Sequence, residues 1–292
     1  AQKAEDGFTA TGNQLFAAKG LNDNREVQLF GDPARVTRLT ETLEGPRIDL
    51  KELSRQAKVI GSGRIRFITD RGLDGQILPN ATPIDIFWSD HMEFQHRRAH
   101  FIGNIRVVMN NGTTQRMEVT CSGLDVHFDR DVALGQRASD RNFIAVDSGN
   151  DGTPALGPIE LIQCHSHVVV KIDQITDGVT SARHNAEFAD LSVNLKTGDF
   201  NAMGRGFLSS VSPDRNGELQ GSSRAIARAN TPAQTHETAF VFMKADFIGK
   251  VEGNLHRKEA TLSHHVEAVV SPARRVDEKI NFDSIATAHL PE

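Results

Sequence analysis

The chain has 292 residues, enough for one large domain or two of average size. Hydrophobic residues make up 38% and charged residues 24%, which is typical of a folded protein and argues against a disordered chain. The net charge of −5 argues against nucleic-acid binding, which requires a basic surface. No run of apolar residues approaches the length of a membrane-spanning helix.

Strand-like patterns run through most of the chain. Apolar and polar residues alternate in short runs that glycine, Asn-Gly or Asp-Gly interrupts, a spacing typical of all-β proteins. The odd positions of Phe101–Met109 fall on one face, and Asn110–Gly112 supplies a hairpin turn. The returning strand starts with apolar residues at the odd positions of Met117–Cys121, and Ser122–Gly123 interrupts its register as a β-bulge would. The sequence therefore predicts an all-β fold.

A short motif recurs four times, as an apolar strand, a turn and then Ala-x-apolar-x-Gly-x-apolar. Its most similar copies are Ala99–Ile105 and Ala245–Val251, and looser copies are Ala57–Ile65 and Gly198–Gly206. The copies form two pairs, so we expect repeated antiparallel strands in a stacked array. Glycine in the second strand of each copy allows either a close approach of the backbone or a bend where the sheet curves.

A Gly- and Pro-rich stretch separates the two pairs of repeats. Residues 148–158 have the sequence Ser-Gly-Asn-Asp-Gly-Thr-Pro-Ala-Leu-Gly-Pro, which is typical of a linker. The sequence therefore predicts a first β unit at residues 1–147, this junction at 148–158, and a second β unit at residues 159–292.

One strand of the first unit is similar to a known family. Val27–Val36 (Val-Gln-Leu-Phe-Gly-Asp-Pro-Ala-Arg-Val) resembles the apolar-x-Leu-x-Gly-Asn-Pro-Ala-x-Val strand of the OstA-like (LptA) family of lipopolysaccharide-transport proteins. The flanking pattern of the family is matched at Ala10–Phe16, Gly45–Leu50 and Ala57–Phe67. The likeness is best over residues 8–130 and weaker over 185–256, so the chain resembles a larger, duplicated relative.

The resemblance implies a fold, a compartment and partners. It implies an open β-jellyroll (a β-taco) in the periplasm, with the acyl chains of lipopolysaccharide or another acylated glycolipid between its two sheets. It also implies assembly through open edge strands, by β-augmentation with copies of the chain or with other envelope transport proteins.

The inward apolar side chains of these strands are the candidate lipid-binding groove. In the first half they are Val59, Ile65, Phe67, Ile86, Trp88, Phe94, Phe101, Ile105, Val107, Met117, Val119, Val126 and Phe128. In the second half they are Phe188, Val193, Leu195, Phe200, Phe242, Phe247, Val251 and Leu255. The alternative interpretation is that these side chains fill a closed sandwich core.

Basic residues on the same strands are candidate ligands for a phosphate or sugar head group. Arginine suits phosphate because its planar fork donates two hydrogen bonds at once. The candidates are Arg64, Arg66, Arg97 and Arg98, with Arg106 and Lys250 as further members. The alternative role is that of solvated charges on an outer face, which discourage aggregation.

The two cysteines, Cys121 and Cys164, each lie in a strand-like run and have two interpretations. They are either small buried side chains or a disulfide between neighbouring strands, which would fit an oxidising periplasm. Their number and spacing do not indicate a metal site or a redox motif.

Motifs of catalysis and metal binding are absent from the sequence. Gly61–Gly63 lacks the Gly-x-Ser-x-Gly frame of hydrolases, and neither a P-loop nor a dinucleotide-binding glycine motif occurs. His165 and His167 share a strand face but lack the third converging ligand that zinc needs. We therefore expect neither enzyme activity nor a cofactor.

The sequence thus predicts a non-enzymatic periplasmic scaffold that carries or bridges lipopolysaccharide, or another glycolipid, to the outer membrane. The alternative is a structural β-rod or assembly protein of the cell envelope or surface, with a closed core. The chain begins at Ala1 without a signal-peptide pattern, and we expect it to be a processed form or a piece of a longer polypeptide.

Overall fold

The computed structural model consists of strands and the turns between them, which confirms the predicted all-β class for the part of the chain that it describes. In that part, no helix has the length and apolar character needed to cross a membrane. The described residues are 8–19, 25–38, 41–51, 54–72, 77–111, 114–129, 159–214, 240–278 and 288–289.

The longest of these strands are β11 to β14, between residues 159 and 254. The first ten are β1 (Phe8–Thr11), β2 (Gln14–Lys19), β3 (Arg25–Arg38), β4 (Glu41–Lys51), β5 (Gln56–Ile60), β6 (Gly63–Arg71), β7 (Ile77–Trp88), β8 (His91–Gln95), β9 (Arg98–Asn110) and β10 (Gln115–Phe128). The others are β11 (Ile159–Thr176), β12 (Val179–Asn194), β13 (Asp199–Pro213), β14 (Phe240–Asn254), β15 (Glu259–Ser263), β16 (Glu267–Ala273) and β17 (Ala288–His289).

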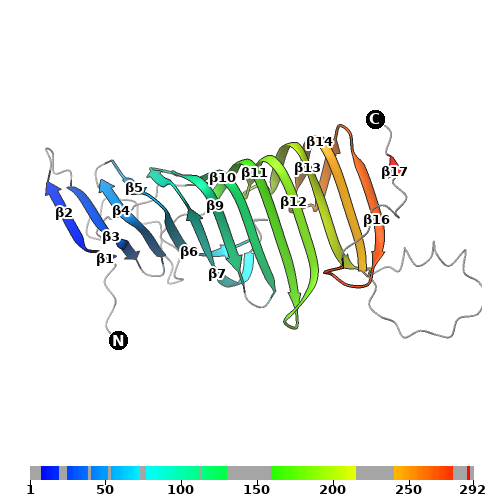
Figure 1. Cartoon of the computed structure of the whole chain (residues 1–292), viewed down its shortest axis with the longest axis horizontal. Helices are drawn as coiled ribbons and strands as arrows, with labels where there is room; N and C mark the ends of the chain where they lie inside the picture. Colours follow the sequence, from blue (N-terminus) through cyan, green and yellow to red (C-terminus); the bar gives the residue numbers. More distant parts are fainter. Residues whose placement is uncertain are drawn as a thin grey trace, which may run out of the picture.

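All described strands belong to one 17-stranded sheet with antiparallel pairing (Figure 1). Several long strands each pair with two short strands, one along each half of the long strand. Strand β3 pairs with β1 and β2, β4 with β6 and β5, β9 with β7 and β8, and β14 with β16 and β15. Strands β9 to β14 pair in chain order without such an interruption.

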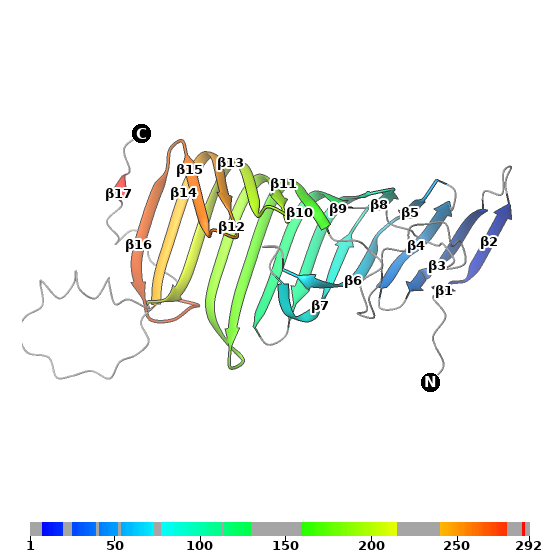
Figure 2. The ribbon, with the colours of Figure 1, turned by 180° about the vertical axis from the view of Figure 1, so that it is seen from behind.

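Each long strand bends between the two short strands that it accompanies, so that the sheet folds over along its length (Figures 1 and 2). We call the half with β1, β6, β7 and β16 the first wall, and the half with β2, β5, β8 and β15 the second wall. Register shifts accompany the bend, because an extra residue locally turns a strand. They lie between Phe30 and Ala34, Thr120 and Gly123, His165 and Val168, and Glu187 and Asp190.

Each predicted repeat contributes a glycine at this bend. Gly61 separates β5 from β6, and Gly103 lies between the parts of β9 that pair with β8 and with β7. Gly204 pairs with Gly249, which lies between the parts of β14 that pair with β15 and with β16. Gly61, Gly103 and Gly204 have φ of +91°, +83° and +98°, which only glycine adopts without strain. The repeat motif therefore coincides with the bend.

The predicted hairpin is formed by β9 and β10. Met109 pairs with Met117, and a register shift between Cys121 and Gly123 confirms the predicted bulge. The sequence predicts that the odd positions of Phe101–Met109 on β9 point inward, and every apolar residue at these positions is buried. The tip of the turn lies outside the described residues.

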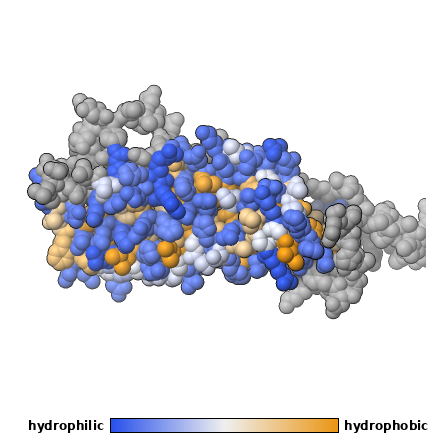
Figure 3. Space-filling view, turned by 90° about the horizontal axis from the view of Figure 1, so that it is seen from above, coloured by the Kyte–Doolittle hydropathy of each residue, from blue (hydrophilic) through white to orange (hydrophobic). Residues whose placement is uncertain are grey.

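One hydrophobic cluster extends from Leu29 on β3 to Val251 on β14 and so includes residues of both predicted units. Strand β10 pairs directly with β11. The predicted junction at 148–158 lies outside the described residues, and the division into two units remains a prediction. Strands β2 and β16 lie at opposite ends of the elongated sheet, and its surface seen from above is largely hydrophilic, with hydrophobic atoms in separate patches (Figures 1 and 3).

Candidate ligand-binding interior

A row of apolar side chains runs along the first wall. Residues that pair across neighbouring strands point to the same face of a sheet, so successive pairings define a continuous line. The line passes through Ala10, Val36, Leu43, Ile65, Ile86, Val107, Val119, Val170, Ala186, Leu208, Ala245 and Ala268. Every member is apolar, from β1 at one end to β16 at the other.

A matching row runs along the second wall. It passes through Leu15, Leu29, Ile48, Val59, Met92, Phe101, Leu124, Cys164, Leu191, Ala202, Val251 and Leu262. This row extends from β2 to β15, and it contains no charged or hydrogen-bonding side chain apart from the weakly polar thiol of Cys164.

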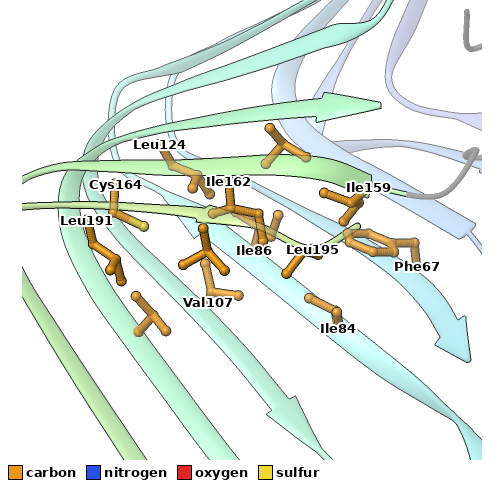
Figure 4. A pocket seen from close by; sticks show the side chains of 13 residues that line it. Phe67, Ile84, Ile86, Val107, Leu124, Ile159, Ile162, Cys164, Leu191 and Leu195 are labelled. Carbon is orange, nitrogen blue, oxygen red and sulfur yellow. The ribbon is translucent and has the colours of Figure 1, made fainter. Parts of the chain in front are cut away.

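The two rows face each other across an apolar cavity of about 50 Å³ near the middle of the molecule (Figure 4). From the first wall it is lined by Phe67, Ile84, Ile86, Val107 and Val119. From the second wall it is lined by Leu124, Val126, Ile159, Ile162, Cys164, Leu191, Val193 and Leu195. The cavity has room for only a few water-sized groups, so side chains fill most of the space between the walls here.

Most of the predicted groove residues lie in this interior, and Val193 and Leu195 line the cavity. Those in the core cluster are Val59, Phe67, Ile86, Trp88, Phe94, Phe101, Ile105, Val107, Met117, Val119, Val126, Phe128, Phe188, Phe247 and Val251, and Ile65 and Phe200 pack against it. Phe242 instead lies in a second cluster with Val211 and Ala273. It is five residues from Phe247, so strand alternation puts it on the outer face of β14.

Two of the predicted head-group arginines are bound to a carboxylate of the chain itself. Arg64 and Arg66 alternate with Ile65, so they point away from the interior. Asp85 accepts from both, at 2.7 Å from Arg64 and 2.8 Å from Arg66. Burial alone would raise the pKa of Asp85, but the hydrogen bonds from the two guanidinium groups lower it overall, so the carboxylate is ionised.

The other two head-group candidates have similar partners. Arg97 lies 3.1 Å from Glu160 and also donates to the carbonyl of Phe128 at 2.9 Å. Arg98 lies 2.9 Å from Asp125. The four arginines therefore hold strands together on the outer side, and a role in binding a head group stays a prediction.

Asp125 is a buried carboxylate that the sequence does not reveal. It accepts hydrogen bonds from Arg98 at 3.0 Å and from His100 at 2.6 Å, and His165 lies 3.2 Å from its second oxygen. Burial alone would raise the pKa of Asp125, but the hydrogen bonds from His100 and Arg98 lower it. In the described part of the chain, no group of three or more His, Cys, Asp or Glu residues is arranged to hold a metal ion.

The two cysteines lie next to each other in the core. Both are free thiols, and Cys164 lines the cavity. A hydrogen bond between Cys121 and Cys164, together with burial, raises the pKa of Cys164. The structure thus contains the small buried side chains of the first interpretation, and a disulfide under oxidising conditions stays a prediction.

A polar pair on the inner face of the first wall was also missed. The hydroxyl of Ser210 lies 3.0 Å from Nδ1 of His184. The available signal was alternation, because Ala182, His184 and Ala186 occupy successive positions on one face of β12. His184 therefore places a polar group between two alanines on the inward face of β12.

No protein-family model matches the chain, and no curated protein matches it in sequence. The resemblance to the OstA-like family therefore depends on the motifs of Val27–Val36 and of the repeats. The geometry of the interior carries the functional argument.

Proposed function

We propose that the protein is a non-enzymatic periplasmic scaffold that holds the acyl chains of lipopolysaccharide, or of another glycolipid, between its two walls. In this proposal the folded sheet is an open β-jellyroll with four OstA-like repeats in two pairs. The observation that carries the proposal is the pair of apolar rows, because both extend from one end of the sheet to the other. An acyl chain can therefore remain in apolar surroundings at any position along the sheet.

The driving force for binding comes from the burial of methylene groups. Each buried CH₂ contributes about 0.8 kcal/mol, so an acyl segment of about ten methylenes contributes about 8 kcal/mol before ordering costs. The small cavity means that the walls must separate, or side chains must rearrange, to admit a chain. The proposal therefore includes an opening movement of the two walls along the bend.

The ends of the rows support transfer to a partner. Leu15, the first member of the second-wall row, is 57% exposed on the edge strand β2. An exposed edge with an apolar side chain is suited to β-augmentation by another strand. Pairing with a copy of the chain, or with another envelope transport protein, would continue the apolar row into the partner.

Site-specific photo-crosslinking tests the proposal. A photoreactive amino acid at Val193, which is partly exposed and lines the cavity, should give a lipid adduct in protein purified from the cell envelope. The matched position is Val179 at the start of the same strand, which is 68% exposed and should give none. Absence of an adduct at Val193, or equal adducts at both positions, would contradict the proposal.

The second candidate is a structural β-rod of the cell envelope. Dense packing favours it, because Phe101 and Phe247 are each only 1% exposed and the cavity is about 50 Å³. A rod needs no ligand and acts only through its ends. It predicts discrete end-to-end multimers and no lipid adduct at Val193.

A further inference from the structure

The inner face of the first wall opens toward the C-terminal end of the sheet. A second line of pairings, next to the apolar row, passes through Ile84, Met109, Met117, Ile172, His184, Ser210, Met243 and Val270. Along this line Met109 and Met117 are 1% and 3% exposed, whereas Met243 and Val270 are 49% and 48% exposed. The interior is therefore closed at β9 and β10 and accessible at β14 and β16.

His184 and Ser210 lie where the closed part of this line meets the accessible part. Both are half-buried, and their pairing neighbours Ile172 and Met243 are apolar. Ala186 and Leu208, the next inward residues on their strands, pack against the core cluster. A polar pair in such surroundings has a cost unless each group finds a hydrogen-bonding partner.

Burial lowers the pKa of His184, so its imidazole is neutral at neutral pH. In a neutral imidazole one nitrogen donates and the other accepts. When the Ser210 hydroxyl donates to Nδ1, the proton is on Nε2, and among the described residues Nε2 has no hydrogen-bond partner. An uncharged N–H donor on an apolar surface suits a carbonyl oxygen better than a phosphate, which prefers a cation.

We infer that His184 and Ser210 form a site for the ester or amide carbonyl of an acylated lipid. Nε2 of His184 donates to the carbonyl oxygen, and the Ser210 hydroxyl donates to Nδ1 in the tautomer that this requires. The acyl chain extends along the inner face toward Ile172 and Met117, and the rest of the lipid extends past Met243 and Val270 toward solvent. The inference rests on the proposed function and adds which group of the lipid is recognised and at which end of the sheet it lies.

Two ligands that differ only in the carbonyl test the site. A palmitoyl glycerol ester and its hexadecyl glycerol ether would each compete with a bound fluorescent alkyl probe on the full chain. Because the ether lacks the carbonyl and therefore one hydrogen bond to the protein, we expect the ester to bind about fivefold more tightly. His184→Phe should abolish this preference, and Ser210→Ala should reduce it.

Two further variants separate recognition from folding. His184→Gln retains an N–H donor and should keep part of the ester preference, and His256→Phe, at an exposed turn position, should keep all of it. Equal binding of ester and ether by the unaltered chain would overturn the carbonyl site and leave the proposed function standing. Failure of the alkyl probe and of both lipids to bind would overturn the proposed function, and the carbonyl site with it.

Discussion

At the scale of single residues, the Asp125 carboxylate connects three strands on the outer face of the sheet. Its partners Arg98 and His100 belong to β9, and His165 belongs to β11. These contacts join residues 27, 25 and 40 positions apart, which is why alternation within one strand could not predict them. The carboxylate is buried and ionised, so an amide in its place retains one acceptor oxygen and turns an NH₂ donor toward donors of the chain.

Asp125→Asn should lower the free energy of unfolding at neutral pH by about 1–3 kcal/mol. The folded-state pKa of Asp125 is lowered, so its stabilising effect is present above the unfolded pKa of about 3.9 and is lost as pH falls through the folded pKa. The difference between the variant and the unaltered protein should therefore shrink below about pH 4. Urea unfolding across this pH range measures it.

The matched control for this experiment is Asp90→Asn. The Asp90 side chain is 65% exposed, and its neighbour His91 lies 3.2 Å away. An exposed pair of this kind contributes about 0–1 kcal/mol. Equal losses for the Asp125 and Asp90 variants, or a loss for Asp125→Asn that is the same at all pH values, would contradict the network.

Alkylation distinguishes the two interpretations of the cysteines. Cys164 and Cys121 are 3% and 6% exposed, so a thiol reagent should not label them in the folded protein. Both should be labelled once the protein is unfolded without a reductant. Labelling that requires a reductant would show instead that the two form a disulfide in the purified protein.

At the scale of elements, the repeat glycines explain how straight strand patterns produce a folded sheet. Gly103 has φ of +83°, and a Cβ there would meet Ser89 Oγ at 2.7 Å and Asp90 Cβ at 2.9 Å. The repeated motif singled out these glycines as places for either a bend or a close approach of the backbone, and the structure shows a bend. It did not predict which halves of the sheet face each other, since that depends on the pairing of short strands such as β5 and β8.

Gly103→Ala should destabilise the protein more than Gly178→Ala. Both glycines have positive φ, which costs alanine about 1–2 kcal/mol. A Cβ at Gly178, in the β11–β12 turn, would meet nothing within 4 Å, so only Gly103→Ala has the added clash of roughly 1–3 kcal/mol. Urea unfolding of the two variants measures the difference, and equal losses would mean that the bend tolerates a side chain.

The edge strand β2 gives a prediction about assembly. Leu15→Asp places a charge at the open end of the second-wall row, and charges on an edge strand discourage pairing with another chain. We expect the variant to be monomeric at concentrations where the unaltered protein self-associates in sedimentation velocity. Val179→Asp, on the exposed β11–β12 hairpin, should leave self-association unchanged. Self-association that persists in Leu15→Asp would exclude this edge.

At the scale of the whole molecule, the period of two in each strand predicted most of the interior correctly. Phe101, Val107 and Val119 are inward because apolar residues alternate with polar ones over several positions. Phe242 lies instead in the second cluster, and the apolar pair of Phe240 and Phe242 does not by itself show which face of the strand points inward. The phase follows from Phe247, which packs in the core. That the two apolar rows face each other could be found only from the strand pairings across the whole sheet.

If the interior between the two walls holds lipid, the protein should carry lipid when it is purified from its own envelope. Native mass spectrometry before and after extraction with organic solvent measures this. We expect a bound mass of lipid size that is lost on extraction while the protein remains folded. An unchanged mass, accompanied by discrete multimers, would exclude a lipid-filled interior and favour the structural rod.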